Sequence, residues 1–160
     1  MFLVADYMEI KEIENTEERE HITRKILEAL PEWFGIPSAV DDYVKGSGKY
    51  PFWCSFDQGK PVGFICLKPT SADTVEIYVT GVLKEYHRQH IGMQLFQNAY
   101  TYALEEGFTF MQVKTVQLGK YPEYDRTNRF YQAVGFKELE VFPELWDENN
   151  PCCIYVMAIQ

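Results

Sequence analysis

The sequence predicts an α+β fold with one mixed sheet, on three observations. Residues 75–80 alternate apolar and polar side chains with the period of two of a β-strand, whereas every fourth residue from Ile91 to Ala103 is apolar, as in a helix. Strand-like and helical segments follow one another without a repeat or a Pro/Gly/Ser-rich linker. The 160 residues, 46% hydrophobic and 16% aromatic, supply enough apolar material for a single domain spanning residues 1–160.

The N-terminal residues predict a strand followed by a helix. Residues 7–13 form the strand-like segment. Asn15-Thr-Glu-Glu18 resembles a capping box, in which a side-chain oxygen accepts a hydrogen bond from a backbone N–H of the first helical turn. The helix that follows would carry Ile22, Ile26 and Leu30 on one face, and Pro31 would end it because proline cannot continue a helix.

A loop, a short helix and a hairpin are predicted next. Residues 30–37 mix prolines with aromatic residues, which is typical of a loop, and residues 38–44 predict a short helix that ends at Gly46-Ser-Gly48. Residues 52–56 and 61–67 predict two strands of a β-hairpin, with the turn at Asp57-Gln-Gly-Lys60.

The second half of the chain predicts four strands and two helices. Gly107 is placed to end the longer helix, and Gly135 to end a shorter one that Asp125 would cap. The resulting order of elements predicts a central mixed, mostly antiparallel sheet of about seven strands, flanked by about four helices. The predicted strands are residues 74–82, 110–116, 137–142 and 153–159, and the helices are residues 91–106 and 125–134.

Composition narrows the classes of partner. The net charge of −9 repels phosphate backbones and anionic lipids, so we expect neither a nucleic acid nor a membrane as partner. The same charge favours a cationic small molecule or a basic peptide, although many enzymes are acidic only for solubility. The apolar run of residues 2–5 is too short for the core of a signal peptide, which predicts a cytoplasmic protein.

The four cysteines and three histidines do not have the spacing of a zinc site, so no metal is expected. Cys152 and Cys153 are adjacent, which leaves a vicinal disulfide and two reduced thiols as alternatives, of which reduced thiols fit a strand better.

The residues between strand 74–82 and helix 91–106 are suited to an anion. The first N–H groups of a helix have no partner within the helix, and the helix dipole adds positive potential at that end. Gly92 allows the backbone to approach a ligand closely, and Arg88 adds a phosphate donor, with His87 as a further candidate. On composition alone, an ordinary solvated loop is an equal alternative.

Gly81 interrupts the preceding strand between Thr80 and Val82. A glycine inside a strand often marks a bulge or the close approach of a ligand. A strand that separates from its neighbour here would leave N–H and C=O groups free to pair with an extended ligand. A long molecule with amides at one end and phosphates at the other fits both features.

These residues resemble the GNAT superfamily of acetyl-CoA-dependent N-acyltransferases. The segment from Val82 to Gly92 is similar to the family signature, a strand ending in Val, a loop Gln/Arg-x-x-Gly-x-Gly/Ala and a long helix. His87 replaces the usual Gln or Arg, and His90 replaces the first glycine, a position where histidine tolerates positive φ better than most residues. Thr127-Asn-Arg-Phe-Tyr-Gln-Ala-Val-Gly-Phe136 resembles the family's Phe-Tyr-x-x-x-Gly-Phe element, although Tyr124 stands where asparagine is common.

The resemblance implies a single GNAT-like domain that uses acetyl-CoA as co-substrate. It implies N-acetyl transfer to a primary amine of a small molecule or peptide, within one ternary complex. Backbone groups of the strand end would pair with the pantetheine arm, and the loop with the first helical turn would hold the pyrophosphate. The implied cofactor-binding residues are Thr80, Gly81, Val82, His87, Arg88, Gln89, His90, Ile91, Gly92, Met93 and Asn128.

Two residues are candidates for the proton transfers. Tyr131 lies where the family's general acid lies, and a phenol is able to protonate a leaving thiolate; alternatively, its ring packs beside Phe130 and Phe136. Glu76 shares a strand face with Tyr78 and is the candidate general base. The alternatives for Glu76 are a solvated residue, a structural ion pair, or proton transfer through water.

Two similar segments are candidates for the acceptor side. Pro31-Glu-Trp-Phe34 and Pro143-Glu-Leu-Trp-Asp-Glu148 both combine aromatic residues with carboxylates in predicted loops. In the family, loops at these positions border the acceptor cleft, and tryptophan rings attract cationic amines. The implied substrate-binding residues are Glu32, Trp33, Phe34, Tyr78 and Trp146; alternatively, the tryptophans fill the edge of the core and the acids are solvated.

The predicted function is therefore an N-acetyltransferase. A CoA- or acyl-CoA-binding sensor without efficient catalysis is the first alternative, and a domain that binds another phosphate ligand is the second. Direct transfer is favoured over an acyl-cysteine intermediate, because no cysteine stands beside a histidine in a recognisable nucleophile arrangement. A homodimer is a mild expectation.

Overall fold

The computed structural model describes residues 8–160, so the predictions for residues 2–5 and for Tyr7 lie outside the described residues. The chain forms two compact units, the first comprising residues up to Leu67 with Tyr78–Tyr100, and the second Lys68–Ile77 with Thr101–Gln160. Seven strands form one sheet in the order β1-β2-β3-β4-β5-β7-β6, with four α-helices. The β4–β5 pair is parallel, whereas the pairs β1–β2, β2–β3, β5–β7 and β6–β7 are antiparallel, so the predicted α+β class with a mixed sheet is confirmed.

The first unit begins with predicted local structure. The Asn15 side chain accepts a hydrogen bond from the backbone N–H of Glu18 at 2.8 Å, which confirms the helix start. The hairpin turn is also confirmed, with positive φ at both Gln58 (48°) and Gly59 (82°), the geometry that two-residue hairpins favour. The elements are β1 (Glu9–Glu12), α1 (Thr16–Glu28), α2 (Pro37–Ser47), β2 (Phe52–Asp57), β3 (Lys60–Pro69), β4 (Thr74–Val82) and α3 (Ile91–Glu105).

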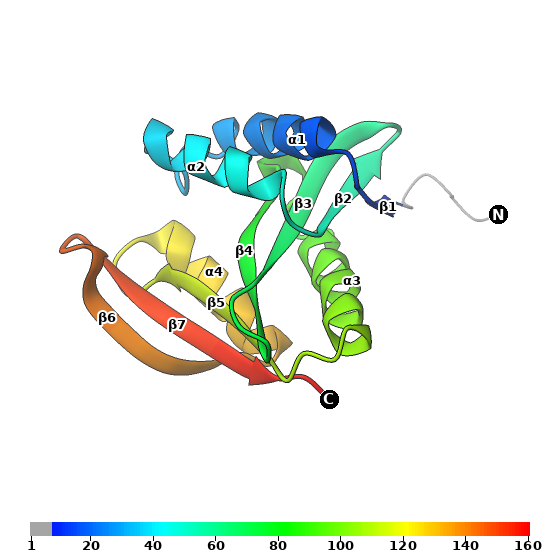
Figure 1. Ribbon diagram of the computed structural model, residues 1–160. Helices are drawn as coiled ribbons and strands as arrows, with labels where there is room; N and C mark the ends of the chain where they lie inside the picture. The colour runs from blue at the N-terminus through cyan, green and yellow to red at the C-terminus, as the bar shows by residue number, and fades with distance from the viewer. Residues whose placement is uncertain (1–7) are drawn as a thin grey trace. The chain divides into compact units, whose positions relative to one another are not determined.

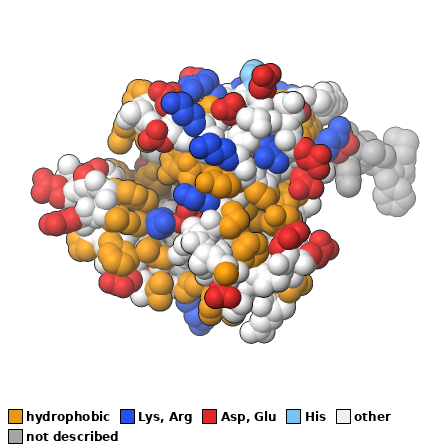
Figure 2. Space-filling view, in the orientation of Figure 1, with side chains coloured by type: hydrophobic (Ala, Val, Ile, Leu, Met, Phe, Trp, Pro, Cys, Tyr) orange, Lys and Arg blue, Asp and Glu red, His pale blue; other side chains and the backbone are white. Residues whose placement is uncertain are grey.

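Helices cover both faces of the sheet in this unit. α1 and α2 lie beside each other on one side of β2 and β3, and α3 lies on the other (Figure 1). A Cβ added at Gly81 would lie 3.1 Å from Leu30, which follows α1, and one added at Gly63 would lie 3.2 Å from Ile91 and Leu95 of α3. The two glycines therefore allow the helices to pack closely on the strands, while charged side chains cover the outer surface of α1 and α2 (Figure 2).

The second unit is built on β5 (Phe110–Val116), α4 (Pro122–Val134), β6 (Lys137–Asp147) and β7 (Asn150–Ala158). β5 pairs with β7 along its whole length, from Phe110↔Ala158 to Val116↔Cys152. The predicted glycine ends are confirmed, because Gly107 and Gly135 have φ of 83° and 116°. After Gly135, the N–H of Phe136 returns to the Tyr131 carbonyl at 3.0 Å and closes the last turn of α4.

Two predicted boundaries are wrong. α4 begins at Pro122, whose fixed φ suits the first helical position, so Asp125 lies inside the helix and its carboxylate accepts from the Gly119 N–H at 2.7 Å. The predicted end of the short helix at Gly46-Ser-Gly48 is confirmed, because α2 runs to Ser47 and Gly48 is its C-cap. β6 continues to Asp147, so residues 143–146 lie in a strand rather than a loop; β6 is the edge strand, where proline is tolerated.

Three further observations concern the described residues. Between residues 8 and 160, no helix is long and apolar enough to cross a membrane. The same part of the chain has no group of three or more His, Cys, Asp or Glu side chains arranged to hold a metal ion. All four cysteines are buried free thiols, which answers the question of a vicinal disulfide at Cys152 and Cys153.

Candidate active site

The corner between β4 and α3 has an unusual backbone. After the short 3₁₀ helix Lys84–Tyr86, Arg88 and His90 adopt φ of 63° and 62°, in the left-handed region. His90 thus has the conformation that a glycine would adopt without strain, and histidine is accommodated there. The first N–H to bond within α3 is that of Gln94, to the His90 carbonyl at 3.0 Å, so the N–H groups of residues 90–93 precede the intrahelical bonds and form the positive end of the helix.

The side chains of this loop divide into two groups. Arg88, Gln89 and His90 are exposed, and the Gln89 amide donates to the Glu85 carbonyl at 3.2 Å. Ile91 is buried in the core, so its side chain is not available and only its backbone is able to meet a ligand. The loop therefore offers backbone N–H groups and one guanidinium, which is a donor set suited to phosphate oxygens.

The end of β4 leads into this loop. The register between β4 and β5 ends at Ile77↔Val113, four residues before Gly81, so the strand leaves its partner earlier than the sequence analysis expected. Gly81 itself makes room for side chains of the α1 region. The Thr80 hydroxyl donates to the Phe64 carbonyl at 2.8 Å, and the Val82 carbonyl lies 2.7 Å from Nε2 of His87.

The predicted acceptor residues Glu32 and Trp33 contact the same corner. Glu32 forms an ion pair with Lys84 of the 3₁₀ helix. The hydrogen bond from Lys84, together with a backbone hydrogen bond, lowers the pKa of Glu32 below its ordinary value of 4.5. The Trp33 ring meets the His87 ring edge-to-face, with centroids 5.9 Å apart. The structure therefore brings a predicted acceptor segment and a predicted cofactor loop together.

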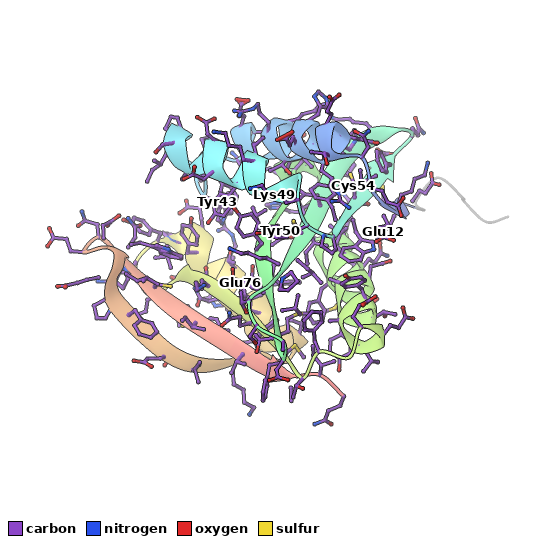
Figure 3. All side chains as sticks on the ribbon, viewed as in Figure 1. Glu12, Tyr43, Lys49, Tyr50, Cys54 and Glu76 are labelled. Carbon is purple, nitrogen blue, oxygen red and sulfur yellow. The ribbon has the colours of Figure 1, made fainter. Side chains whose placement is uncertain are left out.

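Phe34 and Tyr78, also predicted for the acceptor, belong to one aromatic cluster. Ring centroids are 5.9 Å apart for Phe34 and Tyr43, 5.4 Å for Tyr43 and Tyr78, and 5.7 Å for Tyr50 and Tyr78. Tyr43 lies on α2 and Tyr50 follows the helix, and both are labelled in Figure 3. All four rings are half-buried, so part of each remains accessible. We call Phe34, Tyr43, Tyr50 and Tyr78 the aromatic cluster.

Tyr78 is held firmly within this cluster. Its hydroxyl donates to the Asp42 carbonyl of α2 at 3.2 Å, and a Cβ added at Gly46 would lie only 2.2 Å from that hydroxyl. Burial, followed by the nearby Tyr43, Cys66, Tyr50 and Asp42, raises the pKa of Tyr78 to about 12. The phenol is therefore neutral at physiological pH. Sequence reasoning missed Tyr43 and Tyr50, because no motif marks them and only tertiary packing brings them to Tyr78.

Tyr131 and Asn128 lie on α4 in the second unit. Both are buried, and the Tyr131 ring packs against Phe130 and Phe136 at 5.7 Å and against Tyr155 at 6.3 Å. Packing beside Phe130 and Phe136 was the alternative to a catalytic role for Tyr131. Its role as general acid stays a prediction. The Asn128 amide donates to the Val116 and Tyr124 carbonyls and accepts from the Tyr155 hydroxyl at 2.6 Å. Its side chain therefore joins α4 to β5 and β7, and its contact with the cofactor also stays a prediction.

The candidate base Glu76 forms an ion pair. Its Oε2 lies 2.6 Å from Nζ of Lys114 on β5, and the Glu76 residue is only 7% exposed. This is the structural alternative that the sequence analysis named. The role of Glu76 as general base therefore stays a prediction.

Trp146 lies near the end of the β6–β7 hairpin. It is 44% exposed, and the adjacent Asp147 accepts hydrogen bonds from the Asn149 N–H and the Asn150 amide, which shape the turn. Acidic side chains gather at this end of the hairpin, at the left of Figure 2. Its role in binding an acceptor stays a prediction.

Comparison with known proteins gives a consistent result. Residues 7–136 match the model of the Acetyltransferase (GNAT) family. A GNAT-family protein from Desulfovibrio desulfuricans has a similar structure, with a TM-score of 0.82, 16% identity, and coverage of 96% of this chain and 100% of the other. The ribosomal-protein-S18-alanine N-acetyltransferase from Escherichia coli has a TM-score of 0.77 and 15% identity, with coverage of 96% of this chain and 95% of the other. An aminoglycoside 6′-N-acetyltransferase in complex with coenzyme A has a TM-score of 0.75 and 18% identity, with coverage of 96% of this chain and 98% of the other.

Proposed function

We propose that the chain, which belongs to the GNAT acetyltransferase family, acetylates a primary amine of a small molecule or peptide. The acetyl donor is acetyl-CoA, and we propose that transfer occurs directly within a ternary complex. The observation that carries the proposal is the β4–α3 corner. In this corner, Arg88 and His90 have left-handed backbone conformations and lie next to the N–H groups at the start of α3.

The donor set of this corner fits a pyrophosphate. Backbone N–H groups of residues 90–93 and the exposed Arg88 guanidinium would hold its oxygens, which the helix dipole also stabilises. Residues 80–82 lie beyond the paired part of β4 and would hold the pantetheine arm through main-chain groups. Bound acetyl-CoA supplies the activated acetyl group; the chain supplies its position.

The aromatic cluster supports a cationic acceptor. Aromatic ring faces attract an ammonium group, and a half-buried neutral phenol such as Tyr78 adds hydrogen bonding without adding charge. The net charge of −9 favours the approach of cations. The two named neighbours act, by their names, on a protein alanine and on an aminoglycoside, so neither size of acceptor is favoured by the fold.

Direct transfer is supported by the state of the thiols. Burial raises the pKa of Cys54, Cys66 and Cys153 to about 12 and that of Cys152 to about 11. Since the thiolate is the nucleophilic form, about one thiol in ten thousand or fewer would be reactive at neutral pH. A cysteine relay is thus disfavoured, and the amine attacks the acetyl group itself.

Two measurements test the proposal. Calorimetric titration with acetyl-CoA, with ATP as control, is followed by a screen of amines for release of the CoA thiol. We expect tight binding of acetyl-CoA over ATP and thiol release that depends on the amine. Equal binding of ATP would indicate a general phosphate site, and binding without release for any amine would contradict the transferase.

The role of Tyr131 is tested by Tyr131→Phe, which removes only the hydroxyl. If it protonates the leaving thiolate, kcat falls by about a hundredfold or more while the Kd for CoA is unchanged. Tyr121→Phe is the matched control, because it removes a hydroxyl that donates to the Asn149 carbonyl at 3.2 Å near the start of α4. Wild-type turnover in Tyr131→Phe would assign Tyr131 to packing alone.

A further inference from the structure

Two side-chain pairs join the segment between α1 and α2 to the segment between β4 and α3. The first is the ion pair of Glu32 with Lys84, which lie 52 residues apart in the chain. The second is the edge-to-face contact of Trp33 with His87, at 5.9 Å and an interplanar angle of 77°. We call these two pairs the clasp. The adjacent residues Glu32 and Trp33 of the first segment thus contact Lys84 and His87 of the second segment.

His87 connects the clasp to the main chain of the proposed cofactor site. Its Nε2 lies 2.7 Å from the Val82 carbonyl, and its ring contacts Trp33. Val82 ends the strand that would hold the pantetheine arm, and His87 begins the loop that would hold the pyrophosphate. A change in the position of this loop therefore moves the side chain that supports Trp33.

The residues around Lys84 are anchored to the β2–β3 hairpin by hydrogen bonds. The Leu83 side chain is buried, and its N–H bonds to the Val62 carbonyl of β3 at 2.9 Å. The Tyr86 N–H returns to the Leu83 carbonyl at 2.9 Å, and the Tyr86 hydroxyl donates to Asp57 at 2.6 Å. These bonds fix residues 83–86 to the β2–β3 hairpin, so Lys84 offers Glu32 a partner held in a defined position.

The acceptor side of the clasp has a corresponding connection. The N–H groups of Trp33 and Phe34 both bond to the Leu30 carbonyl, at 3.1 and 3.0 Å, and the Leu30 side chain is buried. Phe34 then contacts Tyr43 of the aromatic cluster. A continuous series of contacts therefore runs from the loop through His87, Trp33 and Phe34 to the rings proposed to bind the amine.

We propose that the clasp couples the two substrates, with Lys84 and His87 as positioning residues for the acceptor segment. Binding of the pyrophosphate at residues 87–93 would fix residues 30–36 through these two contacts and thereby increase the affinity for the amine. This inference rests on the proposed function. By thermodynamic linkage, the amine strengthens the binding of CoA by the same factor, about fivefold or more in typical coupled sites.

Hydrogen–deuterium exchange with saturating coenzyme A tests the clasp without an identified amine. The probes are residues 87–93, which report CoA binding, and residues 30–36, which report the coupling. In the wild type, we expect CoA to slow exchange in both segments. In Lys84→Met, which leaves every predicted cofactor-binding residue in place, we expect slower exchange at residues 87–93 but about twofold or more less protection at residues 30–36. Lys84→Arg, which keeps the cation, should restore the wild-type pattern.

Arg24→Met is the matched control. Arg24 of α1 pairs with Asp41 of α2 at 3.0 Å, so this variant also removes an exposed ion pair between two elements of the same unit, but one that does not reach the loop. It should keep CoA-dependent protection in both segments. Lack of protection at residues 87–93 in the wild type would overturn the proposed function. Protection there with none at residues 30–36 in the wild type, or full protection at residues 30–36 in Lys84→Met, would overturn the clasp alone.

Discussion

Pro31-Glu-Trp-Phe34 and Pro143-Glu-Leu-Trp146 have nearly the same composition, yet the structure treats them differently. The first lies in the turn after α1, where Trp33 and Phe34 are half-buried and Glu32 is paired with Lys84. The second lies in β6, where Leu145 is 54% and Trp146 is 44% exposed. Both segments begin with Pro-Glu and both include a tryptophan, so composition alone does not decide the outcome.

The difference arises from what each segment has beside it. The first segment faces the β4–α3 corner, which supplies a lysine and a histidine to its glutamate and tryptophan. The second belongs to the edge strand of the sheet, and its register with β7 is interrupted between Phe142 and Asp147. A partner segment turns an aromatic–acidic sequence into a positioned site, whereas a sheet edge leaves the same residues facing solvent.

The largest effect that separates the two segments should be on catalysis. We expect Trp33→Leu to lower kcat/KM for the amine by about tenfold or more, because a tryptophan that contacts a desolvated cation contributes on the order of 2 kcal/mol. Trp146→Leu should lower it by less than about threefold, as expected for an exposed ring. Steady-state kinetics with the best amine from the screen measure both. If both variants lost kcat/KM equally, the two segments would contribute equally to acceptor binding, and the proposed difference between them would be wrong.

A smaller effect is expected on stability, at Gly46. Alanine inside a helix is normally more stable than glycine by about 1 kcal/mol. Here the added Cβ would lie 2.2 Å from the Tyr78 hydroxyl and 2.6 Å from its ring, and such overpacking costs about 1–3 kcal/mol. The cost exceeds the gain, so Gly46→Ala should lower the free energy of unfolding by about 1 kcal/mol in urea denaturation.

The companion to Gly46→Ala is made in the background of Tyr78→Ala. Without the phenol ring the clash disappears, so the same glycine substitution should then raise the free energy of unfolding. An exposed change in the second segment, Leu145→Ser, should stay within about 0.5 kcal/mol of the wild type. If Gly46→Ala stabilises the chain that retains Tyr78, the aromatic cluster is not packed against α2 as described.

The sequence allowed the prediction of elements whose signals are local. The apolar repeat predicted α3 to within one residue of its end at Glu105, and Asn15 and Gly135 marked helix ends because caps depend on neighbouring backbone groups. The prediction was wrong where two local signals competed. Pro122 rather than Asp125 starts α4, and Pro143 lies within β6 because an edge strand tolerates it.

Contacts between distant segments were beyond sequence reasoning. The loop motif identified His87 as a cofactor residue, but the motif does not predict that its ring contacts Trp33 or that Nε2 meets the Val82 carbonyl. Tyr43 and Tyr50 join Tyr78 only because Gly46 lets the phenol approach α2. Side-chain partners of this kind depend on how helices pack on the sheet, which periodicity does not specify.

The smallest expected effect is the titration of Glu32. Its pKa lies below 4.5 because the ionised form accepts a hydrogen bond from Lys84. A carboxyl with a lowered pKa favours the paired conformation above its ordinary pKa, and this contribution is lost as the pH falls through the lowered value. The clasp should therefore be fully formed at neutral pH and lose its ion pair only below pH 4.5.

Carboxyl chemical shifts from carbon NMR measure this titration directly. In the wild type, the midpoint for Glu32 should lie below 4.5, and in Lys84→Met it should move up toward 4.5 because the main hydrogen-bond donor is gone. Lys84→Arg, which keeps a cationic donor, should leave the midpoint low. A midpoint that Lys84→Met does not move would show that the exposed pair is not formed in solution. The first segment would then depend on Trp33 and His87 alone, and its advantage over the second would rest on a ring contact without an ion pair.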